Sequence, residues 1–388
     1  MTELRRINLD GQVVRMTLRG GYIAEISPDT GEATQTIIPL LIEPHVHLDK
    51  FDIATRARAM EPGLFGAIDA TEADKKNWSE ADLRERINRA LGEVSRSGCR
   101  ALRTHVDWDA EEVPIAWRVV AEVAEEWSDR VRVQQASLLR LEMFDDTDRA
   151  TRIAARIAND HGVIGAFVYR NGREAERIAA AFELAEKFDL PLDFHVDEGL
   201  ELEANAIEVI IAETARRGMG GRVLCGHACS LSQRGESEFN RIADAAASAG
   251  VAFTVQPSAN LYLQDMAADR TPRLRGIAPV HELRHAGVEV MLGTDNVRDP
   301  FVPFGALDPL QTLRLGWIAA HMRPSDWLNA VTAIPARLFS FEEYSIRTGA
   351  AADFILLPAG DINAALARPE ITRSVWRKGR QMPQVQEV

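Results

Sequence analysis

Residues 40–51 read LLIEPHVHLDKF, an apolar run that ends in two histidines two positions apart. In a β-strand, the side chains at positions i and i+2 point to the same face. His45 and His47 would therefore project side by side, while Val46 would face the other way. Two imidazoles that project together in this way are typical of a site for a divalent metal ion.

Similar apolar runs recur after this stretch and alternate with long amphipathic segments rich in Ala and Glu. Strands that alternate with helices, with few hairpin signals between them, indicate a parallel sheet. Eight such units within residues 39–345 fit a (β/α)8 TIM-type barrel of the α/β class better than an open doubly wound sheet. The eight strand candidates are LLIEPHVH, ALRTHVDWD, VRVQQASLL, GVIGAFVY, PLDFHVDEG, RVLCGHACS, VAFTVQPSA and VEVMLGTDN.

Both ends of the chain follow a different pattern from the barrel segment. Residues 13–18 and 22–26 alternate in polarity and are separated by Gly and Asp turns. Near the other end, ADFILLP and SVWRKGRQ read as strands, and the Lys-Gly pair suggests a turn. We predict that residues 1–38 and 346–388 together build a small β-sandwich domain beside the barrel.

The composition is that of an ordinary globular protein, with 46% hydrophobic and 27% charged residues among 388. Acidic residues outnumber basic ones by 58 to 45, which gives a net charge of −13 and disfavours nucleic-acid or anionic-membrane partners. No apolar leader and no stretch of 18 apolar residues is seen, so we expect a cytoplasmic protein. Three cysteines without a CxxC pair predict neither disulfides nor a zinc finger.

Polar residues cluster at the predicted strand ends, where barrel enzymes carry their active sites. Five of the nine histidines fall there. A single histidine at a strand end is more often structural than functional, but five on one rim favour a metal site. The residues concerned are His45, His47, His105, His195, Glu198, His227 and Asp295.

Three histidines and one aspartate of this group form the ligand set that we predict for one divalent metal ion. Zinc or iron suits imidazole and carboxylate ligands best, and manganese also accepts them. Such an ion lowers the pKa of bound water and so supplies a nucleophile near neutral pH. The predicted ligands are His45, His47, His195 and Asp295.

Glu198 and His227 are the predicted catalytic partners of this centre, together with Asp295. Glu198 could carry a proton to the leaving group, and His227 could polarise the group under attack or orient the water. The structural alternatives are a first-turn helix acid for Glu198 and a buried hydrogen bond for His227. His105 could equally hold a carboxylate in place or touch the substrate.

The ordered motifs PHVHLDK, RTHVDWD, FHVDEG, GHACS, SANLYLQD, RGIAPVHEL and GTDNVRDPFVPFG resemble the amidohydrolase superfamily, and within it the cytosine deaminase group. This resemblance implies a barrel with a composite β-sandwich and a single metal on the four ligands named above. It also implies proton transfer by Glu198, support from His227, and hydrolysis of an exocyclic amino group on a nitrogen heterocycle. GAFVYRNGRE offers no lysine to bridge two metals, which fits a branch with one metal.

Departures from cytosine deaminase fall on the predicted substrate contacts. Lys50 replaces a threonine, Asn296 replaces a second aspartate, and Arg140 lies where a Phe-Pro-Gln run is expected. Lys50 and Asn296 look more like the related N-isopropylammelide amidohydrolases, which act on s-triazines. If Lys50 and Arg140 face inward, they favour an electron-rich carbonyl or an anionic group on the substrate. Phe301 could stack on a flat ring; each of these residues could also belong to the rim or anchor a loop.

We therefore predict a metal-dependent hydrolytic deaminase of a small pyrimidine, purine or s-triazine type heterocycle. Activated water would attack an amidine-like carbon, and ammonia or an amine would leave. Ring opening of a cyclic amide is the alternative, against which the missing bridging lysine counts. A non-catalytic metal-binding barrel is less favoured, because the proton shuttle and all ligands are present. The expected partner is a small heterocycle, and such barrels often form homo-oligomers.

Overall fold

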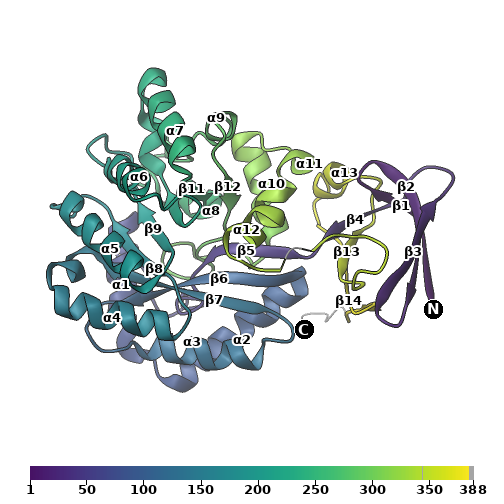
Figure 1. The fold of residues 1–388 in the computed structure, drawn as a ribbon, viewed down its shortest axis with the longest axis horizontal. Coiled ribbons are helices and arrows are strands. Elements are labelled where there is room, and N and C mark those ends of the chain that lie inside the picture. Colours follow the sequence, from purple (N-terminus) through teal and green to yellow (C-terminus); the bar gives the residue numbers. More distant parts are fainter. Residues whose placement is uncertain (343, 384–388) are drawn as a thin grey trace. The chain divides into compact units, whose positions relative to one another are not determined.

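The computed structural model describes residues 1–342 and 344–383, and the chain divides into two compact units (Figure 1). The barrel unit comprises Glu43–Leu91 and Ala101–Leu307. The terminal unit comprises Met1–Ile42, Gly92–Arg100 and the chain from Asp308 onward. The domain limits predicted at residues 38/39 and 345/346 stay a prediction, and residues 384–388 of the predicted β-sandwich domain lie outside the described residues.

Eight strands form one sheet in which the spatial order follows the chain order from β5 to β12. At the ends of this sheet, Val46 pairs in parallel with Asp295, and the Asp295 N–H donates to the His45 carbonyl oxygen at 2.8 Å. The first and last strands therefore meet, which closes the barrel. The strands are β5 (Leu41–Val46), β6 (Cys99–Trp108), β7 (Arg132–Arg140), β8 (Ile164–Val168), β9 (Leu192–Val196), β10 (Val223–His227), β11 (Ala252–Val255) and β12 (Val290–Leu292).

All eight predicted barrel strands are confirmed, and with them the fold class. Strands β9 and β10 are buried along their whole length, as parallel strands covered on both faces must be. Strand β10 (VLCGH) shows no alternation of apolar and polar residues, whereas β9 (LDFHV) alternates although all five of its residues are buried. The polar residues of β9 therefore point into the protein and not into water.

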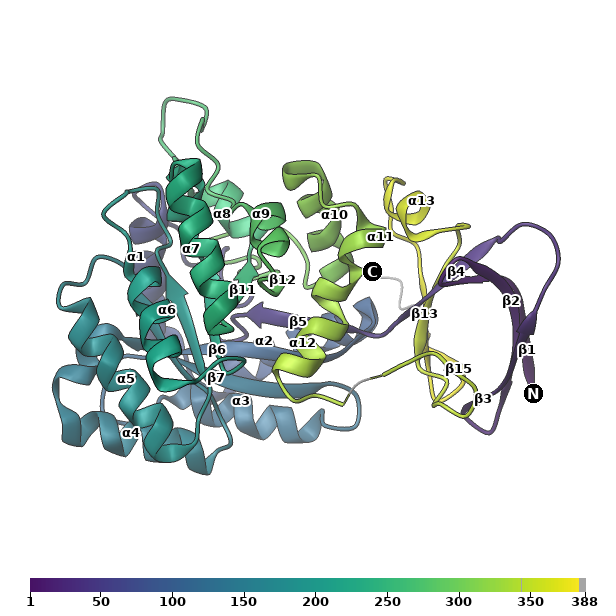
Figure 2. The same ribbon diagram turned by 45° about the horizontal axis from the view of Figure 1, so that its top comes forward.

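Helices of the barrel unit follow the strands and surround them, as Figures 1 and 2 show for α3 to α7. Helix α4 buries Ala150, Ile153 and Ile157, a spacing that gives one apolar stripe, and the Asp146 side chain caps its first turn. None of the helices within the described residues is long and apolar enough for a membrane span. The helices are α1 (Leu64–Asp74), α2 (Glu80–Ser97, of which residues 92–97 belong to the terminal unit), α3 (Ile115–Glu126), α4 (Thr147–Asn159), α5 (Glu174–Phe188), α6 (Ala206–Arg217), α7 (Glu236–Ala249), α8 (Pro257–Leu263) and α9 (Val280–His285).

The terminal unit contains a seven-stranded sheet in the order β15-β14-β13-β4-β1-β2-β3. Strand β13 pairs antiparallel with both β4 and β14, so the two ends of the chain share one sheet. The predicted Lys-Gly turn is confirmed: Lys378 and Gly379 both have positive φ, as a tight hairpin requires. The strands are β1 (Thr2–Leu9), β2 (Gln12–Arg19), β3 (Tyr22–Pro28), β4 (Gln35–Pro39), β13 (Phe354–Leu357), β14 (Ser374–Arg377) and β15 (Arg380–Gln381).

Apolar side chains fill the core of the terminal unit. Phe354 and Trp376 stack at a ring separation of 5.7 Å, and Ile7, Met16 and Ile23 pack into the same cluster. Four further helices belong to this unit. They are α10 (Pro309–Ala320), α11 (Pro324–Trp327), α12 (Ala333–Leu338) and α13 (Ile362–Leu366).

Candidate metal centre and active site

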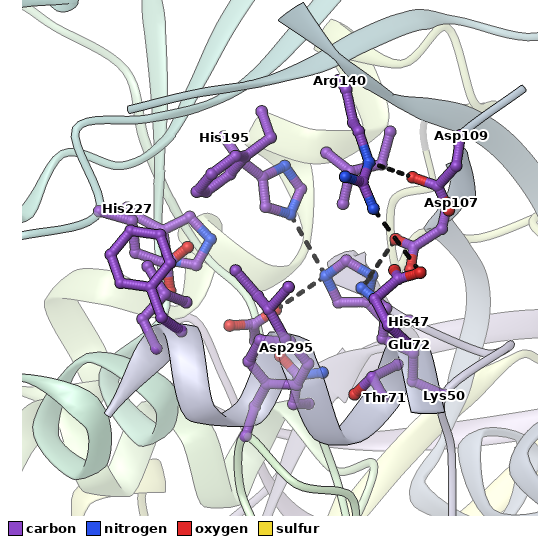
Figure 3. Close-up of a pocket in the computed structure, with 18 of the residues that line it drawn as sticks. His47, Lys50, Thr71, Glu72, Asp107, Asp109, Arg140, His195, His227 and Asp295 are labelled. Carbon is purple, nitrogen blue, oxygen red and sulfur yellow. Dashed lines mark hydrogen bonds and ion pairs between the residues drawn. The ribbon is translucent and has the colours of Figure 1, made fainter. Parts of the chain in front are cut away.

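The four predicted metal ligands meet at the carboxyl ends of β5, β9 and β12. Figure 3 shows three of them, His47, His195 and Asp295. The Nε2 atom of His195 lies 3.1 Å from that of His45 and 3.2 Å from that of His47. Asp295 Oδ1 lies 3.4 Å from His45 Nε2 and 3.2 Å from His47 Nε2. The edge of a tetrahedron is about 1.6 times its centre-to-corner distance, so these separations match metal–ligand bonds of about 2 Å.

The chemistry of the four side chains also fits a cation. Burial lowers the pKa of His47 to about 4 and that of His195 well below its usual range, so both rings are neutral near pH 7. Neutral imidazole is the form that binds metal. Neither carboxylate oxygen of Asp295 receives a well-aligned hydrogen bond from the described residues. The imidazole nitrogens and the carboxylate oxygens point toward one place without a hydrogen-bond donor from the described residues between them. A divalent ion bound there would accept their lone pairs.

The loop that carries Asp295 is joined to β5 by residues that the sequence did not reveal. Glu43 is fully buried, and one of its carboxylate oxygens accepts from the N–H groups of His45, at 3.1 Å, and Thr294, at 3.0 Å. A Cβ atom on Gly293 would lie 2.6 Å from the Cβ atom of His45, so glycine permits this close approach. The one available signal was an acidic residue inside an apolar strand, two positions before His45.

His105 lies beside a carboxylate, as the first of its two predicted roles expects, although the role itself stays a prediction. Its Nε2 atom lies 3.1 Å from Asp193 Oδ2, and the Arg103 guanidinium donates to the same carboxylate at 2.7 Å. The ring of His105 packs against that of His45 at 4.0 Å and has no exposed surface. His105 therefore lies behind a candidate ligand instead of lining the cavity in front of it.

A cavity of about 410 Å³ opens over the candidate centre. His47, His195 and Asp295 lie at its base, and aliphatic and aromatic side chains form much of its wall. This combination of an apolar wall and a few polar groups is typical of small-molecule sites. The apolar wall consists of Leu64, Phe65, Ile68, Leu138, Phe167 and Phe301.

Glu198 and His227 both line this cavity, with Glu198 Oε1 3.3 Å from His227 Nδ1. Burial and the nearby Asp295 raise the pKa of Glu198 well above its usual range. Burial lowers the pKa of His227 to about 3, which keeps its ring neutral. Glu198 precedes α6, which begins at Ala206, so it is not a first-turn acid of that helix.

Lys50 and Arg140 also line the cavity, but each already has a carboxylate partner (Figure 3). Lys50 Nζ lies 2.9 Å from Asp107 Oδ1, and Arg140 Nε donates to Asp109 Oδ1 at 2.9 Å. Lys75 contacts both aspartates as well. The expectation that these two cations favour an electron-rich carbonyl or an anionic group on the substrate stays a prediction, and the carboxylate partners already balance the charge of both cations. Lys50 remains deeply buried, whereas the Arg140 side chain is 55% exposed.

Asn296 and Phe301 complete the set of predicted substrate contacts, and both line the cavity. The Asn296 amide donates to Asp299 Oδ2 at 2.5 Å, which leaves its carbonyl oxygen as an acceptor. Lys50 Nζ lies 5.2 Å from the centre of the Phe301 ring, within range of a cation–π contact. Phe301 therefore packs on a buried cation and forms part of the cavity wall.

Comparisons with known proteins agree with this arrangement. The model of the Amidohydrolase family matches residues 56–383. A pterin deaminase from Rhizobium rhizogenes (strain K84 / ATCC BAA-868) is 33% identical over 346 residues, which cover 88% of this chain and 79% of that protein. The N-isopropylammelide isopropyl amidohydrolase of Pseudomonas sp. (strain ADP) is 24% identical over 335 residues, 83% of this chain and 79% of that protein.

Solved structures share the fold over almost the whole chain. The 5-methylcytosine deaminase from Klebsiella pneumoniae superposes with a TM-score of 0.85 at 24% identity, covering 99% of this chain and 98% of that one. The N-isopropylammelide isopropylaminohydrolase from Burkholderia multivorans ATCC 17616 gives a TM-score of 0.81 at 23% identity, with 98% of each chain covered. The resemblance drawn from the motifs is confirmed, and the chain belongs to the amidohydrolase family.

Proposed function

We propose that the protein is a metal-dependent hydrolase that deaminates a small nitrogen heterocycle. Water would attack an amidine-like carbon of the ring, and ammonia or an amine would leave. One observation carries this proposal. Three imidazole Nε2 atoms and one carboxylate oxygen converge, with four separations of 3.1 to 3.4 Å, at the base of a cavity that Glu198 and His227 also line.

The residues that would hold the metal are His45, His47, His195 and Asp295. A divalent ion bound there lowers the pKa of a water molecule and makes it a nucleophile near neutral pH. Zinc or iron suits this ligand set best, and manganese also accepts it. Because relative affinity does not decide which metal a cell supplies, the identity of the ion has to be measured.

Glu198 is the residue that we expect to move protons. Its carboxyl group lines the cavity, and burial together with the nearby Asp295 raises its pKa well above the usual range. A buried acid with a raised pKa can protonate a leaving amino group, which water alone does poorly. After that transfer, the carboxylate can accept the proton that the attacking water loses. His227 lies 3.3 Å away and would orient the group under attack.

The substrate that fits best is a neutral, flat ring. The relatives are named for their action on pterin and N-isopropylammelide, and the crystallised neighbour is named for 5-methylcytosine. Lys50 and Arg140 are already neutralised by Asp107 and Asp109, which removes the reason to expect an anionic group. A ring carbonyl could still accept from Lys50. Pterin is the first candidate, and a cytoplasmic location and homo-oligomer formation remain predictions from the sequence.

The test is ammonia release by purified protein whose metal content is measured on the same sample. The panel should contain pterin, isoguanine, cytosine, 5-methylcytosine, ammelide and N-alkylated triazines, with a carboxylated pterin as the charged control. We expect ammonia or an amine and an intact ring. Ring-opened products would favour the cyclic amide alternative. Full metal occupancy with no turnover on any ring would refute the enzymatic proposal.

A further inference from the structure

The two ring nitrogens of His227 lie in different surroundings. His227 ends β10 and is only 1% exposed. Its Nδ1 atom lies 3.1 Å from Asn260 Nδ2, whereas its Nε2 atom is buried and has no hydrogen-bond partner among the described residues. The backbone of His227 has a φ of 66°, which is uncommon outside glycine, and its N–H donates to Gln256 Oε1 at 2.9 Å.

The orientation of the Asn260 amide decides which His227 nitrogen carries the proton. Asn260 belongs to α8 and is fully buried. Its Oδ1 atom accepts from the backbone N–H of Gln256 at 3.4 Å. If the amide were turned round, its NH₂ group would face that N–H, and two donors would oppose each other. The NH₂ group therefore faces His227 Nδ1, which has to accept.

We propose that Asn260 is a positioning residue that fixes His227 as its Nε2–H tautomer, so that the ring presents an N–H donor inside the substrate cavity. A neutral imidazole carries one proton, and an accepting Nδ1 places that proton on Nε2. A protonated Nε2 has no lone pair for a metal. This separates His227 from the candidate ligands, although its ring lies 5.0 Å from that of His195.

Glu198 explains why a separate residue is needed for this task. Its Oε1 atom lies 3.3 Å from the same His227 nitrogen. While Glu198 holds a proton, it can act as a second donor to Nδ1, but once ionised it would draw a proton onto that nitrogen. A group that gains and loses a proton in each cycle cannot hold one tautomer. The Asn260 amide does not titrate, so it can hold that tautomer throughout the cycle.

The donor on Nε2 has a specific use if the proposed function holds, on which this part of the inference rests. Negative charge develops on the ring atoms next to the attacked carbon, and a fixed N–H stabilises such charge more than a rotating water does. Asn260 and Gln256 lie within or just before the SANLYLQD motif, to which the sequence assigned no task. Their hydrogen bonds to His227 give this motif a task, which is to hold the His227 ring in place.

The test reads the tautomer directly. Zinc-loaded protein labelled with ¹⁵N-histidine is studied by long-range ¹H–¹⁵N correlation, and His227 is assigned by the signal that His227→Gln removes. We expect a protonated Nε2 and a non-protonated Nδ1. A proton on Nδ1 in the unmodified protein would overturn the proposal, whatever any variant does. Because this readout needs no turnover, it stays valid if the deaminase proposal fails.

Asn260→Asp gives the matched perturbation, because it replaces the donating NH₂ group by an accepting oxygen of equal size. We expect the variant to carry a proton on His227 Nδ1. Asn88→Asp is the control: Asn88, in α2, makes a similar pair of bonds, to the Arg84 carbonyl oxygen of the same helix and from Trp127 Nε1 at the end of α3. The His227 signals should stay unchanged there. An unchanged His227 in Asn260→Asp would contradict the proposal.

Activity supplies the second readout. At alkaline pH, where the His227 ring of Asn260→Asp carries one proton, we expect kcat to fall roughly 10²-fold with little change in KM. Asn88→Asp should keep kcat within about twofold, since no cavity residue changes. A shifted tautomer with unchanged kcat would show that the donor is not used in turnover. That result would overturn the catalytic part of the inference.

Discussion

The rim of the barrel and the core of the terminal sheet are buried equally well but contain opposite chemistry. In the terminal sheet, Phe354 and Trp376 stack among aliphatic side chains, and the buried surface is mainly apolar, with the indole Nε1 of Trp376 as a buried polar atom without a partner among the described residues. At the rim, His195, Glu198 and Asp295 are 5% exposed or less, and several of their polar atoms lack partners. Apolar burial stabilises a fold, whereas burying unpaired polar groups costs free energy.

This difference indicates a division of tasks between the two regions. The rim holds buried polar groups whose burial costs free energy. These groups converge on one point, where a bound ligand or ion would give them the partners that they lack. The buried polar atom of the sheet core, Trp376 Nε1, does not converge with other polar groups on a common point. We therefore expect that changes at the rim abolish activity without unfolding the protein, and that changes in the sheet core lower stability without altering the chemistry.

Removal of the metal should have the largest effect. Dialysis against a chelator is expected to reduce turnover to background, because the ion is what lowers the pKa of the attacking water. The circular dichroism spectrum should stay that of a folded protein, since the barrel strands are packed by apolar side chains. Readdition of zinc should restore the rate. If protein shown to contain no metal kept full activity, the claim that the rim residues serve to bind a catalytic metal would be wrong.

Glu198→Gln should have the next largest effect. The amide keeps the size of the side chain but cannot transfer a proton, so we expect kcat to fall roughly 10³-fold. Metal content and melting temperature should change little. Glu201→Gln serves as the control, because Glu201 lies three positions later in the same loop and bonds Tyr169 instead of the candidate centre. Unimpaired turnover in Glu198→Gln would remove the proposed proton carrier.

Phe354→Ala probes the other side of the comparison. Loss of a fully buried aromatic ring is expected to lower the free energy of unfolding by about 3–5 kcal/mol, measured by denaturant titration. The kcat of the folded fraction should stay unchanged. Tyr22→Ala, at an exposed position on β3, should cost under about 1 kcal/mol. A large loss of kcat in folded Phe354→Ala protein would show that the two regions are not separate in function.

Asp308→Asn should have a moderate effect on stability. The Asp308 carboxylate caps α10 through the Leu310 N–H and receives two bonds from Arg373, at 2.7 and 2.6 Å. Both side chains are largely buried, so loss of the charge is expected to cost about 1–3 kcal/mol. Thermal unfolding measures this cost, and metal content should not change. A variant as stable as the unmodified protein would show that the pair contributes nothing.

Arg140→Gln should have the smallest effect. The side chain is half exposed and paired with Asp109, and exposed ion pairs contribute about 0–1 kcal/mol. We expect less than about a threefold change in KM for a neutral ring. Lys50→Gln is the contrasting variant: it removes a buried cation that pairs with Asp107 and leaves Lys75 as the remaining partner of that carboxylate, so it should be impaired more. A strong preference of the unmodified protein for anionic substrates, lost in Arg140→Gln, would restore the earlier interpretation of this residue.

The barrel and its metal site were largely predictable because both have local signals. Each strand is a short apolar run before a helix, and each candidate ligand ends such a run, so parallel topology alone brings His45, His195 and Asp295 to one rim. The same topology placed Glu198 and His227 beside them.

The supporting contacts were not predictable, because they join residues from different strands through side-chain geometry. Nothing in the sequence pairs Lys50 with Asp107, Glu43 with Thr294, or His105 with Asp193. A charged residue inside a strand gives no indication of the partner that will satisfy it. The inclusion of residues 92–100 in the terminal unit is equally non-local, since it depends on the folded packing.

Metal stoichiometry of Asp295→Asn tests the central claim most directly. Asp295 supplies the one carboxylate of the candidate centre, and the amide removes its charge while keeping its shape. The unmodified protein should contain about one divalent ion per chain, measured by elemental analysis on protein shown to be folded. The variant should retain less than about a tenth of that content while staying folded. Equal metal content in both proteins would contradict the account, because it would place the ion elsewhere.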